Sequence, residues 1–196
     1  MSLIPNILLG PVSGERLAKN IALVIQKDLR HAVIFNKGFQ QASGLDEMDD
    51  EQARDMVQTL TMSGLSMVYL MLETGLESIK NPEQRELYSE ARNSLISAYL
   101  NLLNGNEELE DILPGWVQAL AQYCEGYRQI YQNEKEHLPD IRLHNPWVNI
   151  VGIGAAVRMR NDLPSSEDPL PEVLINIFGE MSGRIVECIV SELKRI

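Results

Sequence analysis

The sequence predicts an all-α fold: a single-domain helical bundle of about six principal helices over residues 1–196. Apolar residues recur at three- and four-residue spacings along most of the chain. Asn-Pro pairs open two of these periodic stretches, at Asn81-Pro82 and at Asn145-Pro146. Strict apolar–polar alternation, the mark of a strand, does not compete with this pattern apart from a short segment at residues 31–35.

The first two helices are expected over residues 14–37 and from residue 49 or 50 to about residue 80. Ser13 is suited to cap the first helix, and Gly38 to end it in a left-handed conformation. The second helix is expected to begin at Asp49 or Asp50, and its apolar face includes Met67 and Met71.

Four more helices are expected: residues 82–104 with a stop at Gly105, residues 114–137, a helix from residue 146 to a proline-rich loop, and residues 171–196. The third of these contains Gly152 and Gly154, which match part of a G-x-G-x-x-G/A nucleotide fingerprint. Val157 stands at the third small position, and an Asn-Pro helix start replaces the strand that the fingerprint requires. The glycines are therefore interpreted as sites where another helix crosses closely.

Composition limits the classes of function. The net charge is −11, and acidic residues are concentrated in residues 46–55, 107–111 and 167–172. Such a surface repels phosphate backbones, so direct binding of nucleic acid is not expected. The acidic runs are interpreted as solvated surface, as a docking face for a basic partner, or as a nucleic-acid mimic that blocks such a partner. No apolar run approaches the ~18 residues of a membrane span, and the N-terminus lacks the basic start of a signal peptide.

Cysteine usage and two side-chain stripes add further expectations. Two cysteines, Cys124 and Cys188, make no disulfide framework and indicate free thiols in a reducing cytoplasm. Tyr123, Tyr127 and Tyr131 are spaced four residues apart on one helix and are candidates for an interface or a pocket wall. Met67 and Met71 are candidates for a core or an adaptable apolar pocket.

One short motif resembles a known family. Arg158, Arg160, Asn161 and Ser165 resemble the start of the second metal motif, N-D-x-x-S-x-x-x-E, of class I terpene synthases. In that all-α family the Asn and Ser bind Mg²⁺, and a nearby Arg contacts the substrate diphosphate. The resemblance implies that Asn161 and Ser165 are Mg²⁺ ligands and that Arg158 or Arg160 binds diphosphate. Pro169 stands where the family has its Glu.

The family also carries an acidic motif well upstream, and Asp49 with Asp50 is the acidic pair that the resemblance assigns to this role. An enzyme of this kind requires Asp49, Asp50 and Asn161 to converge on one cavity, since Mg²⁺ ions bridged by diphosphate link ligands over only a few Å.

The preferred functional prediction is a non-enzymatic, acidic, cytoplasmic protein that binds another protein or a second copy of itself, as an adaptor, inhibitor or assembly subunit. It rests on the lack of a complete catalytic set, phosphate loop or basic patch, so no catalytic residue is assigned and no cofactor is expected. The alternative is a Mg²⁺-dependent, isoprenoid-synthase-like enzyme or degenerate relative acting on a prenyl diphosphate. A second alternative is an apolar-ligand-binding helical protein, whose mark would be a closed pocket lined by Met67, Met71 and tyrosines.

Overall fold

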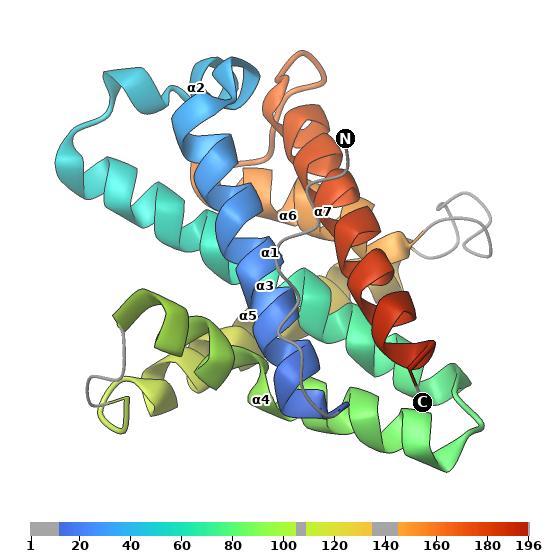
Figure 1. Cartoon of the computed structure of the whole chain (residues 1–196). Coiled ribbons are helices and arrows are strands. Elements are labelled where there is room, and N and C mark those ends of the chain that lie inside the picture. The colour runs from blue at the N-terminus through green and yellow to red at the C-terminus, as the bar shows by residue number, and fades with distance from the viewer. Residues whose placement is uncertain (1–11, 105–108, 135–144, 196) are drawn as a thin grey trace.

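A computed structural model confirms the all-α fold class (Figure 1). The structure describes residues 12–104, 109–134 and 145–195, and this part of the chain contains seven α-helices and one short 3-10 helix, slightly more than predicted. In chain order these are α1 (Gly14–Phe35), α2 (Lys37–Ser43), the 3-10 helix η1 (Leu45–Glu47), α3 (Asp50–Ser78), α4 (Pro82–Asn104), α5 (Leu113–Glu134), α6 (Pro146–Arg160) and α7 (Leu170–Leu193).

The extra helix arises because the first predicted helix is broken at Asn36. Ser13 caps α1 as predicted, but α1 ends at Phe35 instead of residue 37. The Asn36 side chain then accepts a hydrogen bond from the Phe39 N–H over 2.9 Å and caps α2. An asparagine side chain that caps a new turn competes with continuation of the old helix. The predicted stop at Gly38 is therefore wrong, and Gly44 takes the left-handed conformation instead, with φ of 74°.

The other predicted helix starts agree with the structure to within one residue. Asp49 caps α3 in a capping box with Gln52. The Asn81 and Asn145 side chains each accept a hydrogen bond from the second residue that follows them. The predicted stop at Gly105, the end near residue 137 and part of the acidic run at 107–111 lie outside the described residues.

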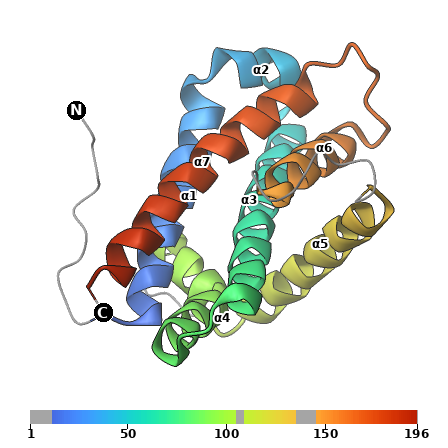
Figure 2. The same ribbon diagram turned by 90° about the vertical axis from the view of Figure 1, so that its right-hand side faces the viewer.

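The helices are arranged around α3. Helices α1 and α7 run side by side along one side of the molecule, and α3 lies between them and α5 (Figure 2). Helix α1 packs mainly on α4 and α7, whereas α3 contacts α4, α5 and α6. One cluster of buried apolar side chains draws on all seven α-helices. Within the described residues, no helix combines the length and the apolar character needed to cross a membrane.

Close packing explains the two glycines of α6, as predicted. A Cβ atom added at Gly152 would lie 2.6 Å from Cγ1 and 3.0 Å from the backbone N of Ile175 on α7. At Gly154 it would lie 2.6 Å from Cε1 of Tyr127 on α5. Ordinary carbon contacts are about 3.5–4.0 Å. Helix α6 is thus wedged between α5 and α7 at distances that only glycine permits.

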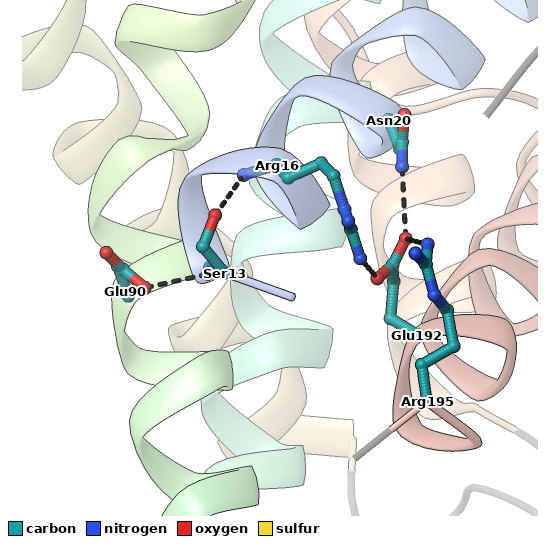
Figure 3. Close-up of polar contacts among 7 residues, drawn as sticks. Ser13, Arg16, Asn20, Glu90, Glu192 and Arg195 are labelled. Atoms are coloured by element: carbon teal, nitrogen blue, oxygen red, sulfur yellow. Dashed lines mark hydrogen bonds and ion pairs between the residues drawn. The ribbon is translucent and has the colours of Figure 1, made fainter. Parts of the chain in front are cut away.

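A buried polar cluster fixes the start of α1 (Figure 3). The Arg16 guanidinium pairs with the Glu192 carboxylate on α7, and the two residues are 6% and 1% exposed. Asn20 Nδ2 donates to the same carboxylate over 3.4 Å. On the other side, the Gly14 N–H donates to Glu90 Oε2 on α4 over 2.7 Å. Both neighbours of α1 are therefore tied to its first turn.

Candidate protein-binding surface

Segments that are distant in the sequence meet at one end of the bundle, where α2 lies beside the loop between α6 and α7 (Figures 1 and 2). Arg160, the last residue of α6, donates from Nη2 to the Ala42 carbonyl on α2 over 2.6 Å. Its Nε donates to Asp168, just before α7, over 3.0 Å. This region, made of residues 34–55 and 161–169, is called the acidic end below.

The acidic end carries an excess of negative charge. Residues 46–55 contain six carboxylates and one basic residue, Arg54, and all six carboxylates belong to exposed residues. Asp49 accepts hydrogen bonds from two backbone N–H groups and caps α3, so one carboxylate has a structural role. Asp46 and Glu47 precede this cap and Asp55 follows the first turn of α3, where the helix dipole has little effect. Helix capping therefore does not account for the whole run.

Exposed apolar side chains accompany these carboxylates. Phe35 at the end of α1 is 68% exposed, its neighbour Ile34 is also exposed, and Leu163 in the loop after α6 is 81% exposed. Isolated exposed apolar residues are common on proteins. Here, however, three large ones belong to the same end of the bundle, and burying each would contribute about 1.5–3 kcal/mol.

Phe35 also borders a groove between α1 and α7 with a volume of about 730 Å³. Ala32, Val173 and Ile177 provide apolar lining. Asp28 and Arg184 cross the groove as an ion pair with a distance of 2.8 Å between Oδ2 and Nε. The rest of the lining is mostly polar or charged, so the groove offers a recess of mixed character beside an exposed aromatic ring.

The loop that carries Leu163 is held by local contacts. Asn161 ends α6 in the left-handed conformation, with φ of 53°. The hydrogen bond from Arg160 lowers the pKa of Asp168, and the Leu170 N–H also donates to Asp168, over 2.9 Å. Leu163 is therefore exposed from a loop whose two ends are fixed.

The two arginines assigned to diphosphate have other contacts in this structure. Cζ of Arg158 lies 4.1 Å from the centroid of the Tyr123 ring and 5.6 Å from that of Tyr127. Arg160 is engaged by Ala42 and Asp168, as described above. The described residues contain no group of three or more His, Cys, Asp or Glu side chains placed to hold a metal ion. Asn161 and Ser165 are not of these four residue types, so the Mg²⁺ site remains a prediction.

The predicted tyrosine stripe lies partly in the core and partly at its margin. Tyr127 is fully buried, and its hydroxyl lies 2.7 Å from Ser63 Oγ on α3. Tyr123 is half-buried and meets Tyr127 edge to face, whereas Tyr131 packs on Trp147 with ring centroids 5.2 Å apart.

The two methionine candidates separate in the same way. Met67 is buried in the core, whereas Met71 is half-buried and lines a depression of about 680 Å³ together with Tyr131 and Trp147. The depression is open to solvent. Of the residues predicted to line a pocket for an apolar ligand, only Met71 and Tyr131 line this depression.

Sequence reasoning identified the acidic run but not the apolar side chains next to it. The sequence pattern places Phe35 inside a longer predicted helix, and it assigns Leu163 no binding role. The available signal was the pair Ile34-Phe35 immediately before an asparagine that can cap a new helix. Comparison with known protein families, with characterised proteins and with solved structures finds no match for this chain.

Proposed function

We propose that this chain is a non-enzymatic protein that binds another protein through its acidic end, as an adaptor, inhibitor or assembly subunit. The observation that supports the proposal is the occurrence of exposed Phe35 and Leu163 at the same end of the bundle as the carboxylates of residues 46–55. The complementary partner carries a basic segment with large apolar side chains.

The two kinds of side chain have different roles in such binding. Carboxylates steer a basic partner and raise its association rate, an effect that salt weakens. Apolar anchors that become buried at an interface supply most of the affinity. Phe35, beside the groove between α1 and α7, is the proposed anchor.

The proposed setting is a reducing compartment such as the cytoplasm. Cys124 and Cys188 are unpaired, and Cys124 is buried. Burial raises the pKa of both thiols, to about 11 for Cys124. Such thiols are largely protonated at neutral pH, as expected for structural cysteines without a redox role.

Self-association through α7 is a second candidate. Val186 and Val190 are exposed on α7, and a Cβ added at Gly183 would meet no atom within 4 Å. The three residues recur at three- and four-residue steps, so they share one face of the helix. Light scattering tests this candidate: Val186→Glu should convert a dimer to a monomer, and a wild-type monomer at high concentration would contradict it.

Selection of random displayed peptides on the immobilised full chain tests the acidic end. The selected peptides should be enriched in Lys or Arg together with large apolar residues, and they should bind more weakly as salt increases. Phe35→Ala should weaken their binding by about tenfold or more. The triple variant Asp46→Asn, Glu47→Gln, Asp55→Asn should slow association.

The matched control neutralises Glu83 and Glu86, exposed carboxylates at the start of α4, and should leave binding unchanged. Peptides without basic enrichment, or binding that tolerates the triple variant, would contradict the proposal. So would a monomer that gains thermal stability from prenyl diphosphates only when Mg²⁺ is present, which would favour the isoprenoid-synthase alternative.

A further inference from the structure

Away from the acidic end, two arginines converge on one carboxylate. Arg128 on α5 donates from Nη2 to Glu73 Oε2 on α3 over 2.7 Å. Nη1 of Arg92 on α4 lies 3.8 Å from the other oxygen of Glu73. All three side chains are half-buried. They are called the arginine cluster below, and two guanidinium groups against one carboxylate leave it with one positive charge.

Glu73 accepts a hydrogen bond from Arg128 but only lies near Arg92. A separation of 3.8 Å is too long for a hydrogen bond, and the other contact of the Arg92 guanidinium is with the Tyr69 ring, 5.3 Å from Cζ to the centroid. Within the described part of the chain, Arg92 Nε is shielded from solvent and has no hydrogen-bond partner. A guanidinium has five N–H donors. Arg92 therefore retains donors for an additional acceptor.

A cavity of about 590 Å³ lies next to the cluster and is lined by Arg92 and Arg128. This volume is within the range of roughly 300–1,000 Å³ that is typical of small-molecule sites. Asn93 and Ser97 add polar groups to the lining. Tyr69 on α3 adds an aromatic ring. The rest of the apolar lining comes from α4 and α5 and consists of Ile96, Leu113, Val117, Leu120, Ala121 and Cys124.

The apolar wall is partly open to solvent. Val117 is 49% exposed although it lines the cavity. Glu125 also lines the cavity, and its Oε2 lies 3.8 Å from Arg128 Nη1. Its side chain is 61% exposed, so solvent screens its charge. The cavity thus combines the Arg92 guanidinium, whose Nε–H is unpaired within the described residues, with an apolar surface that a ligand would cover.

We propose that this cavity binds an amphipathic organic anion, with its head group on Arg92 and its apolar body on the wall from α4 and α5. The planar guanidinium matches a carboxylate or a phosphate head group. Glu73 holds Arg128 beside the cavity, which preserves a second positive group near the head. None of these residues belongs to the acidic end, so the site is independent of the proposed protein binding.

Isothermal titration of the full chain with decanoate, decyl phosphate and decanol, below the concentrations at which they form micelles, tests the site. One molecule of either anion should bind per chain, at least tenfold more tightly than decanol. The preference between decanoate and decyl phosphate identifies the head group. Arg92→Gln should weaken binding of both anions about tenfold or more, because charge-assisted hydrogen bonds are lost.

Two further variants separate a ligand site from general surface effects. Arg85→Gln removes an exposed arginine on α4 that is not among the residues lining this cavity and should leave the affinities unchanged. Val117→Ser retains the arginine cluster but should weaken all three ligands. Circular dichroism verifies that each variant is folded. Equal affinity of wild type and Arg92→Gln, absence of binding to folded wild type, or several molecules bound per chain would overturn the proposal.

Discussion

The contact between α6 and α7 gives the most quantitative prediction, the effect of Gly152→Ala. Alanine favours a helix over glycine by about 1 kcal/mol, so the change would stabilise an isolated α6. In the folded protein the new Cβ would lie 2.6 Å from Ile175 Cγ1 and 3.0 Å from its backbone N. Side-chain rotation cannot move that backbone atom, so the two helices must separate by several tenths of an ångström.

Overpacking of this kind costs about 1–3 kcal/mol, and more where the backbone must shift. Because a backbone atom is in the way, we expect a cost of about 2–3 kcal/mol, in the upper part of this range. That cost exceeds the gain in helix propensity and leaves a net loss of about 1–2 kcal/mol in the free energy of unfolding. For a chain of 196 residues this corresponds to a fall in Tm of about 2–8 °C. Urea unfolding followed by circular dichroism, together with thermal melts, measures both quantities.

The matched control is Gly183→Ala on α7. Gly183 is exposed, and a Cβ there would meet no atom within 4 Å. The control should stabilise the chain by about 0.5–1 kcal/mol, measured at concentrations where light scattering shows a monomer. If Gly152→Ala stabilised the chain to the same extent, the close crossing of α6 and α7 would be refuted.

Three further predictions concern ionisable groups. Glu192→Ala should lower the free energy of unfolding by about 3–5 kcal/mol, because it leaves a buried arginine without its carboxylate; a loss below about 1 kcal/mol in urea unfolding would contradict the buried pair. Because burial raises the pKa of both thiols, iodoacetamide at pH 8 should label Cys188 slowly and Cys124 only after denaturation, and rapid native labelling of Cys124 in a mass spectrum would be inconsistent with its burial. The lowered pKa of Asp168 means that its pair with Arg160 stabilises the fold above about pH 4 and that this contribution is lost as the pH falls through the folded pKa. Arg160→Gln should raise that pKa in an NMR titration, whereas an unchanged value would show that the pair has no effect.

Most helix starts were predictable because their signals are local. An Asn, Pro or Asp side chain acts on backbone groups within three residues, so Asn81, Asn145 and Asp49 indicate the starts of α4, α6 and α3 directly. The break at Asn36 was missed for a related reason. Asn36-Lys37-Gly38 is compatible with either a glycine stop or a new cap, and the choice depends on how α2 packs against α7.

The candidate sites depend on distances that the sequence does not contain. Glu73, Arg92 and Arg128 belong to three helices, and only helix packing brings both arginines within 4 Å of Glu73. The assignment of Arg158 to diphosphate had the same limitation. The sequence indicates a cation near a helix end, but not that two tyrosine rings from α5 lie beneath it.

The order of the helices along the chain has a consequence for synthesis on the ribosome. Helix α1 buries its apolar face against α4 and α7, and α7 begins about 135 residues after α1 ends. At roughly 5–20 residues per second, that face waits about 7–27 s for its last neighbour. Throughout that interval a nascent chain displays the part of the α1 apolar face that α7 covers, even after α4 has been made. The topology therefore exposes this protein to chaperones, or to aggregation, before α7 is made.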